Sequence, residues 1–316
     1  MWQFDGLMEM IEQSDIITLF RHEHPDCDAV GSQFGLKNWI EENWPEKRVY
    51  ALGNEYCAQG NCWPESDYCS NSDIEQSLAI VLDTANRVRA DDARFQSAAH
   101  IIKIDHHPNH DPYGERLYVF EESAATCEIL AEFFRQNSDR HMSLATAEYL
   151  FRGLLTDTLS FRTTNTTSHT LFIAGWLADY GVRISDLNRQ LFDVNLEDYK
   201  FANVLRRSLQ IRGGRLAYRI VSIDEMREWD MTISATKNFI EEFGNVREFE
   251  IYCIFCEKRV NDVIYYDGSL RSKHVVINKV LESYGGGGHA NACGIKNLSF
   301  EKMNELLDDL YTLIPH

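Results

Sequence analysis

Positive charge is in short supply in this chain of 316 residues. Lys and Arg number 31 against 49 Asp and Glu, which gives a formal net charge of −18 at pH 7. Proteins hold long nucleic acids mainly through cationic side chains that displace counterions from phosphates, so a surface of this sign repels a duplex. The composition therefore excludes a basic clamp for long duplex nucleic acid, and any phosphate ligand has to be short and held locally.

Long hydrophobic runs are missing as well. No apolar stretch approaches the roughly 20 residues that a membrane-spanning helix needs, and the N-terminus lacks the basic, apolar and small-residue order of a signal peptide. We expect a cytoplasmic protein with no membrane partner. Repeats are absent too, and a hydrophobic content of 44% is enough for a sizeable core.

The eight cysteines do not form a convincing zinc or redox pattern. Cys253 and Cys256 have C-x-x-C spacing, but they lie in an aromatic, β-branched run typical of a strand, so we favour core packing over a redox site. Cys57, Cys62 and Cys69 lie among loop-forming residues without a fourth ligand nearby. In a chain of this length, we interpret the thiols as reduced.

The order of apolar and amphipathic segments predicts an α/β protein with two domains. In the first half, short apolar runs at 15–20, 48–52, 78–82 and 100–104 alternate with helix-period stretches, a pattern typical of a parallel sheet. We predict a metal-binding catalytic domain at 1–190, a helical linker at 191–212 and a smaller α/β domain at 213–316. The active site is expected in the cleft between the two domains.

Acidic residues and histidines collect where the predicted strands of the first domain end. Ligand sites of open parallel sheets lie at these carboxyl ends, so segments that are far apart in the sequence should converge there. Four carboxylates and two imidazoles are available at these ends and in one helix: His22, Asp26, Asp28, Asp83, His106 and Asp157.

These six residues predict a site for two metal ions. Asp26 and Asp28 are one residue apart, so their side chains can reach two neighbouring ions, and one carboxylate has to bridge if each ion receives three or four ligands. Oxygen-rich ligation with imidazole and without thiolate favours Mn²⁺, with Mg²⁺ or Fe²⁺ as alternatives. Any one of these residues alone is better explained as a helix cap or a hydrogen-bonded histidine, but six on four segments are not.

The motifs around these residues resemble the DHH phosphoesterase superfamily, and most closely its nanoRNase/pAp phosphatase group. In the first domain the resemblance rests on the Asp-His-His triplet at 105–107, the segments 22–32 and 153–158, and Asp83. The segments 268–272 and 286–294 resemble the associated substrate-binding domain. One departure is Leu159, where many members of the family have glycine.

The resemblance implies a role for each of these residues. One Mn²⁺ would be held by His22, Asp26 and Asp83, and the other by Asp28, Asp83, His106 and Asp157. His107 would face the scissile phosphate, and Asp105 would support the site from behind the metal ligands.

The second domain supplies candidate substrate contacts. Arg271, just past a predicted strand, can contact a phosphate through two parallel hydrogen bonds, and Ser272 follows it. A run of glycines exposes backbone amides and lacks side chains, so an anionic group can come close to it, and we expect a helix to follow. The candidate residues of this run are Gly286, Gly287, Gly288 and His289.

The charges of the site indicate how the substrate would be held. Two divalent cations would offset the charge of the four aspartates, so the charge of the substrate has to be met by His107, Arg271, His289 and the glycine amides. Most of these groups lie in the second domain, which predicts that cleavage needs domain closure. The resemblance to the nanoRNase/pAp phosphatase group implies release of 5′-mononucleotides from short single-stranded RNA, and conversion of pAp to AMP and phosphate.

Other functions stay open on the sequence alone. A phosphodiesterase for pApA or cyclic di-AMP would use nearly the same pocket, whereas the segment around His289 is unlike that of an inorganic pyrophosphatase. A non-catalytic nucleotide sensor would be expected to have lost a metal ligand, and all six are present. A homodimer is compatible with the sequence.

Overall fold

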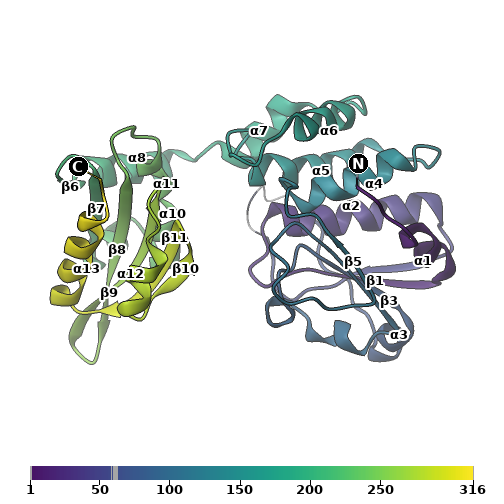
Figure 1. Ribbon diagram of the computed structural model, residues 1–316, viewed down its shortest axis with the longest axis horizontal. Helices are drawn as coiled ribbons and strands as arrows, with labels where there is room; N and C mark the ends of the chain where they lie inside the picture. The colour runs from purple at the N-terminus through teal and green to yellow at the C-terminus, as the bar shows by residue number, and fades with distance from the viewer. Residues whose placement is uncertain (1, 58, 60–62, 316) are drawn as a thin grey trace. The chain divides into compact units, whose positions relative to one another are not determined.

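The computed structural model describes residues 2–57, 59 and 63–315. The chain divides into two compact units, Met1–Asp193 and Val194–His316 (Figure 1). Each unit has its own sheet and its own hydrophobic core. In the described part of the chain, no helix combines the length and the apolar character that crossing a bilayer requires.

The sheet of the first unit is five-stranded and parallel, in the order β2-β1-β3-β4-β5. The four expected strands are confirmed, and their apolar runs lie in the core. The fifth strand was not expected, because its sequence is short and only partly buried. The strands are β1 (Ile16–Phe20), β2 (Arg48–Ala51), β3 (Leu78–Leu82), β4 (His100–Asp105) and β5 (Arg116–Val119).

Helices connect and cover these strands. The long helix α2 begins at Cys27, since Asp26 caps it by accepting hydrogen bonds from the amides of Asp28 and Ala29. The helices are α1 (Leu7–Gln13), α2 (Cys27–Asn43), α3 (Asn71–Gln76), α4 (Thr126–Gln136), α5 (Leu144–Asp157), α6 (Ser168–Ala178) and α7 (Ile184–Phe192), with 3₁₀ turns η1 (Arg87–Arg89) and η2 (Ala93–Ser97).

Helices α2 and α5 approach each other closely at two glycines. A Cβ on Gly31 would lie 2.6 Å from the carbonyl oxygen of Tyr149, and a Cβ on Gly153 would lie 2.4 Å from Cys127 Sγ. The same Cβ on Gly153 would lie 2.8 Å from Oδ1 of Asp28. These contacts set the position of the first turn of α2, which carries Asp28.

The second unit contains a six-stranded mixed sheet in the order β10-β11-β9-β8-β7-β6. The pair β7 and β8 is parallel, and the other pairs are antiparallel. The strands are β6 (Gln210–Arg212), β7 (Leu216–Val221), β8 (Ile251–Val260), β9 (Val263–Ser272), β10 (Gly287–His289) and β11 (Ala292–Leu298). The helices are α8 (Leu196–Arg207), α9 (Ile223–Glu228), α10 (Ile233–Asn238), α11 (Glu241–Gly244), α12 (Asn278–Ser283) and α13 (Phe300–Thr312).

Helices pack on both faces of this second sheet. Cys253 and Leu270 face the core that α12 and α13 complete, whereas Ile254 faces the core formed with α8 to α11. Phe201 and Leu205 of α8 are fully buried in that second core, so the helix expected as a linker packs within the second unit.

Two local expectations in the second unit are wrong. The helix expected after the glycine run is the strand β11, because Gly287 and Gly288 belong to the edge strand β10 and a tight turn at Ala290 and Asn291 returns the chain antiparallel to it. Arg271 lies within β9 rather than beyond a strand, since β9 extends to Ser272.

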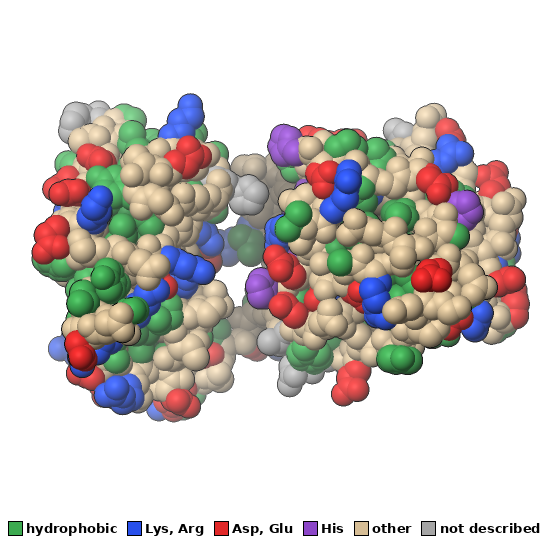
Figure 2. Space-filling model, turned by 90° about the horizontal axis from the view of Figure 1, so that it is seen from below, with side chains coloured by type: hydrophobic (Ala, Val, Ile, Leu, Met, Phe, Trp, Pro, Cys, Tyr) green, Lys and Arg blue, Asp and Glu red, His purple; other side chains and the backbone are tan. Residues whose placement is uncertain are grey.

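Negative charge is distributed unevenly between the units. The first unit carries 15 Lys and Arg against 31 Asp and Glu, and the second carries 16 against 18. Figure 2 shows many acidic side chains over the visible face of the first unit, and basic side chains interspersed with acidic ones on the second. The excess of negative charge therefore belongs to the first unit.

Candidate metal centre

The six residues predicted as metal ligands converge at the carboxyl edge of the first sheet. His22 follows β1, Asp83 follows β3 and His106 follows β4. The N-cap and the first turn of α2 bring in Asp26 and Asp28, and Asp157 is the last residue of α5. The carboxyl ends of parallel strands lie at the same edge of a sheet, so the topology of the sheet brings these segments together.

A first group of potential ligands consists of His22, Asp26 and Asp83. The Nε2 atom of His22 lies 3.4 Å from Oδ2 of Asp83 and 3.8 Å from Oδ2 of Asp26. The other ring nitrogen, Nδ1, lies 2.7 Å from the carbonyl oxygen of Glu23, which orients the imidazole so that Nε2 points at the carboxylates.

A second group consists of Asp28, His106 and Asp157. The Nε2 atom of His106 lies 3.4 Å from Oδ2 of Asp157 and 4.0 Å from Oδ2 of Asp28. Asp28 is fully buried, and its carboxylate accepts hydrogen bonds from the amides of Thr126 (2.7 Å) and Cys127 (2.9 Å) at the start of α4.

Asp83 connects the two groups through its two carboxylate oxygens. Oδ2 lies 3.4 Å from Nε2 of His22, while Oδ1 lies 3.4 Å from Nε2 of His106. The hydroxyl of Thr126 also donates to Oδ1, at 3.1 Å. The φ angle of Asp83 is 51°, in the left-handed region that Asp tolerates better than most residues, and strained backbone of this kind collects at functional sites.

The spacing of these atoms fits shared cations better than direct hydrogen bonds. Imidazole–carboxylate distances of 3.4 to 4.0 Å exceed the roughly 2.7–3.2 Å of an N–H···O bond. Two ligand atoms that each lie about 2.1 Å from one ion are separated by about 3.0–3.4 Å in octahedral or tetrahedral geometry. The three distances of 3.4 Å match this separation, and the distances of 3.8 and 4.0 Å exceed it. Carboxylates with imidazole, and no thiolate, suit Mn²⁺, Mg²⁺ or Fe²⁺.

The electrostatics of the cluster also calls for positive charge. Burial and the neighbouring Asp83 carboxylate raise the pKa of Asp28 to about 7. Burial and the other carboxylates raise the pKa of Asp157 well above its ordinary value. Although burial opposes the effect, Asp26 and Asp83 raise the pKa of His22 to about 10. Carboxylates crowded in this way are relieved by a divalent cation, whose binding releases protons from its ligands.

His107 is held by a carboxylate behind the metal ligands. Its Nδ1 lies 2.8 Å from Oδ1 of Asp105, and Oδ1 also accepts the His107 amide at 3.1 Å. The fully buried Lys103 pairs with Oδ2 of Asp105 at 3.2 Å and donates to the carbonyl of Ala85 at 2.9 Å. Nδ1 of His107 also lies 3.5 Å from Asp83, which makes His107 a further potential ligand.

Lys103 was not among the residues expected at the site. The signal in the sequence is a lysine inside the apolar strand β4, which is costly unless the ammonium is paired. Thr126 was missed as well, because its contribution comes mainly from the backbone amide at the start of α4, which a sequence does not distinguish from any other helix start.

A left-handed turn follows Asp157 directly. Leu159, Ser160 and Phe161 have φ angles of 47°, 57° and 66°, a conformation that costs non-glycine residues energy. The hydroxyl of Thr158 accepts a hydrogen bond from the amide of Phe161 at 3.0 Å and donates one to the carbonyl of Leu154 at 2.6 Å. Leu159 therefore has a backbone conformation that glycine adopts without strain.

The expected substrate contacts of the second unit divide between the two faces of its sheet. Arg271 lies on the face that carries α10, and its Nε is 3.4 Å from Oε1 of the exposed Glu241. Ser272 points to the other face, where its hydroxyl donates to the carbonyl of Val275 at 2.6 Å and accepts from Asn291 at 2.9 Å. A substrate contact for Ser272 is therefore not supported by this geometry.

The glycine run forms β10 and packs tightly against β11. A Cβ on Gly286 would lie 2.8 Å from the carbonyl oxygen of Gly294, and one on Gly288 would lie 2.4 Å from that of Ala292. A Cβ on Gly287 would meet nothing within 4 Å. Two of the glycines are therefore required by packing, and one leaves backbone open. The side chain of His289 lies outside the described residues.

Comparison with known proteins assigns the chain to a family. The model of the DHH family, N-terminal domain, matches residues 16–154, and that of the DHHA1 domain matches residues 213–314. The bifunctional oligoribonuclease and PAP phosphatase NrnA of Bacillus subtilis is 34% identical over 97% of this chain and 97% of its own length. The chain belongs to the DHH phosphoesterase family.

This DHH protein is also similar to a longer phosphodiesterase and to a solved structure. The cyclic-di-AMP phosphodiesterase GdpP of Geobacillus thermodenitrificans is 25% identical over 90% of this chain, which covers 45% of that protein. An exopolyphosphatase-related protein from Bacteroides fragilis superposes with a TM-score of 0.85 at 20% identity, over 98% of this chain and 96% of the other. That superposition shows that the two chains share a fold.

Proposed function

We propose that this DHH protein is a phosphoesterase that uses two divalent cations to hydrolyse short oligoribonucleotides to 5′-mononucleotides, and pAp to AMP and phosphate. The observation that carries the proposal is Asp83, whose two oxygens face a separate imidazole each at 3.4 Å. The similarity to the Bacillus subtilis enzyme over 97% of both chains supports the choice of substrates.

The proposal assigns the ligands as two groups with Asp83 in common. His22 and Asp26 would complete one group; Asp28, His106 and Asp157 would complete the other. We propose Mn²⁺ as the cation, on the basis of the carboxylate and imidazole donors. When bound, such a pair lowers the pKa of water and stabilises charge on the entering and leaving oxygens of a phosphoryl group.

The residues behind the ligands would position the phosphate. Asp105 accepts from Nδ1 of His107 and thereby fixes the ring, which leaves Nε2 to donate a hydrogen bond to a phosphate oxygen. Burial raises the pKa of Asp105, but the hydrogen bond from His107 and the charge of the adjacent Lys103 outweigh it and hold that pKa below its ordinary value. Arg271 is proposed to contact a second region of the substrate through its guanidinium.

The proposal is tested by comparing substrates with and without metal. Protein freed of metal with a chelator should not turn over pAp or a 5′-phosphorylated RNA trimer, and Mn²⁺ should restore both activities. Elemental analysis of active protein should give close to two ions per chain. Activity in the metal-free protein, or full activity with one ion per chain, would contradict the proposed centre.

Two further substrates distinguish the neighbouring functions. The similarity to GdpP favours cyclic di-AMP or pApA as a second candidate substrate class. Faster Mn²⁺-dependent turnover of cyclic di-AMP than of pAp would favour that alternative. Tight binding of pAp without release of phosphate would instead show a nucleotide sensor, and turnover of pyrophosphate alone would show a pyrophosphatase.

A further inference from the structure

One face of the second sheet is open beside α10. Residues paired across antiparallel strands point to the same face, so Arg271, Ser269 and Gly294 share a face. Gly287, which pairs with Gly294 across β10 and β11, lies on it too. Leu270 and Cys293, which alternate with these residues, are buried on the opposite face among α12 and α13.

A hollow of about 310 Å³ lies on this open face. Its floor is formed by the backbone of β10 and β11, where the glycines leave no side chains. Two lysines border it, one from α10 and one from β11, two residues beyond Gly294. The lining residues are Lys237, Gly285, Gly286, Gly287, Gly294, Ile295 and Lys296.

The two lysines are available for an external anion. In the described part of the chain, no hydrogen bond or ion pair engages the ammonium group of Lys237 or of Lys296. Neither residue was predicted from the sequence. Two uncompensated cations over a floor without side chains form a concave surface that attracts a compact anion.

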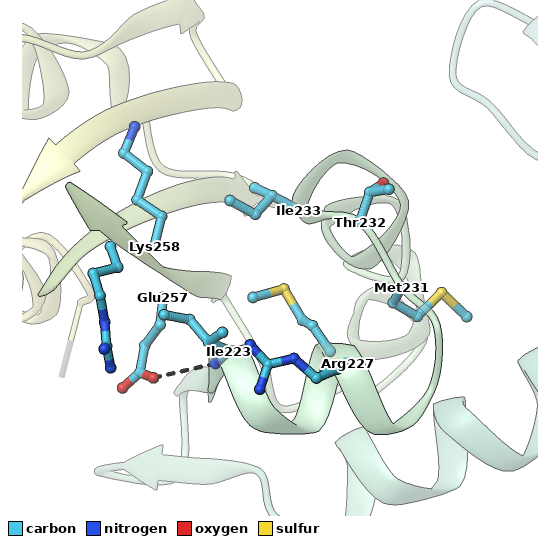
Figure 3. A pocket seen from close by; sticks show the side chains of 9 residues that line it. Ile223, Arg227, Met231, Thr232, Ile233, Glu257 and Lys258 are labelled. Carbon is cyan, nitrogen blue, oxygen red and sulfur yellow. Dashed lines mark hydrogen bonds between the residues drawn. The ribbon is translucent and has the colours of Figure 1, made fainter.

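The larger hollow of the second unit has a different chemistry. Its volume is about 390 Å³, and methionine and isoleucine side chains from α9 and α10 line it (Figure 3). Two of its three cationic side chains have carboxylate partners, since Lys258 contacts Asp267 at 3.0 Å and Arg227 contacts Asp224 at 3.3 Å; the third is Arg259. The two hollows therefore differ in their lining: apolar side chains dominate the larger one, whereas glycine backbone and two lysines form the other.

We propose that Lys237 and Lys296 bind a terminal phosphate monoester of the substrate, distinct from the phosphate that is cleaved. This inference rests on the function proposed above. A phosphate monoester carries close to two negative charges at neutral pH, which matches two ammonium groups, and its oxygens can approach the open backbone at Gly287. An internal phosphodiester carries one negative charge and matches the pair less well.

The consequence is a requirement for two phosphates in a good substrate. The metal centre engages the phosphate that is cleaved, and the lysine pair engages a second, terminal phosphate. pAp and 5′-phosphorylated dinucleotides carry both groups. A dinucleotide with only its internal phosphodiester lacks the group that the lysine pair binds, so it is expected to have a higher KM at a similar kcat.

The experiment compares the dinucleotides pApA and ApA, which share the scissile bond and differ in the 5′-phosphate. In the Lys237→Gln/Lys296→Gln variant, KM for pApA should rise by roughly 10- to 100-fold, as expected for losing charge-assisted contacts. KM for ApA should change by less than about twofold. Lys237→Arg/Lys296→Arg keeps both charges and should retain a low KM for pApA.

Controls separate this inference from the proposed function. Lys302→Gln removes an exposed lysine from α13, on the opposite face of the sheet, and should leave both KM values unchanged. The single variants Lys237→Gln and Lys296→Gln provide two further folded proteins, checked by thermal melting. If the wild type cleaves pApA and ApA with equal KM, or if the Gln variants keep the wild-type KM for pApA, the lysine site is wrong while the phosphoesterase stands. If the wild type cleaves neither dinucleotide, and also leaves pAp and the RNA trimer intact, both proposals fail.

Discussion

Asp83 is the residue on which both ligand groups depend. Asp83→Asn keeps the size of the side chain and its contact with Thr126, but it removes the charge that two imidazoles face at 3.4 Å. We expect activity on pAp to fall by more than about 100-fold, since even changes behind metal ligands cost 10- to 100-fold. Metal content, measured by elemental analysis, should fall with it.

The control for this variant is Asp139→Asn, at a side chain that is 80% exposed. That change should leave both the activity and the metal content as they are. A bound metal content in Asp83→Asn equal to that of the wild type would show that Asp83 is not a shared ligand.

His107 should contribute to catalysis without holding a metal. Its Nδ1 is engaged by Asp105 at 2.8 Å, which is the shorter of its two carboxylate contacts. We expect His107→Gln to lower kcat on pAp by roughly 10²- to 10⁴-fold, the range for loss of a positioned proton donor or acceptor. Metal content should stay at the wild-type level, and a loss of one ion per chain would instead identify His107 as a ligand.

At the scale of elements, the site depends on how closely α2 and α5 pack. A methyl group on Gly153 would meet Cys127 Sγ at 2.4 Å and Asp28 Oδ1 at 2.8 Å, so Gly153→Ala has to displace the ligand or its helix. We expect a loss of about 1–3 kcal/mol in the free energy of unfolding. Loss of activity should accompany it, measured by denaturant unfolding and by turnover of pAp.

Gly175→Ala is the matched control for Gly153→Ala. It makes the same change inside α6, where a Cβ would meet nothing within 4 Å. Because alanine favours helix over glycine by about 0.5–1 kcal/mol, this variant should be as stable as the wild type or slightly more stable. If the two variants had equal stability and equal activity on pAp, close packing of α2 against α5 would not be required for the site.

The turn after β9 is held by one carboxylate. Glu250 accepts hydrogen bonds from the amides of His274 and Val275 at 2.6 and 3.1 Å and pairs with the His274 ring at 2.9 Å. Burial opposes ionisation, but these contacts outweigh it and lower the pKa of Glu250 below its ordinary value. Because the folded state favours the ionised form, the stabilisation is present at neutral pH and is lost as the pH falls through the lowered pKa.

Glu250→Gln should therefore destabilise the protein by about 1–3 kcal/mol at pH 7, the cost of hydrogen bonds to a charged group. The difference in Tm between wild type and variant should shrink below about pH 4. A difference in Tm that stays constant from pH 7 to pH 3 would show that the charge of Glu250 does not matter.

Strong apolar periodicity made part of the fold predictable. The strands β1 to β4 are short buried runs, and they were identified within one residue at each end. β5 was missed because its exposed residues break that pattern. We expected a helix where the strand β11 lies. Close packing against β11 requires glycines in the preceding segment, and in a sequence such glycines cannot be distinguished from a glycine loop that precedes a helix.

The metal ligands were predictable for a different reason. They follow buried strands of a parallel sheet, and the topology alone brings those strand ends together. The contacts that depend on three-dimensional proximity were not predictable. Lys237 and Lys296 are surface lysines 59 positions apart in the sequence, and nothing local to either one marks it as part of a hollow.

At the scale of the whole molecule, the net negative charge differs between the two units. The first unit carries 31 acidic against 15 basic residues, whereas the second is close to balanced with 18 against 16. The net charge of −18 alone indicates uniform repulsion of nucleic acid. The actual distribution leaves the second unit free to attract a short phosphate ligand while the first repels a long one.

This distribution predicts how substrate length and salt interact. Repulsion of a long RNA by the acidic surface is screened as salt rises, because the Debye length is about 10 Å at 0.1 M ionic strength. The direct contacts with the terminal nucleotide are the same for long and short substrates. Their contributions therefore cancel in the ratio of the two kcat/KM values. We expect kcat/KM for an RNA 24-mer relative to a trimer to rise by roughly 2- to 10-fold between about 50 and 300 mM salt.

The measurement is the ratio of the two kcat/KM values at constant Mn²⁺, with salt as the only variable. Electrostatic exclusion makes the ratio increase with salt, since only the longer substrate extends over the acidic surface. Steric exclusion gives a low ratio that does not depend on salt, because screening leaves the space available to the strand unchanged. A ratio that stays constant across this range would therefore assign the length preference to the shape of the site and not to the charge of the first unit.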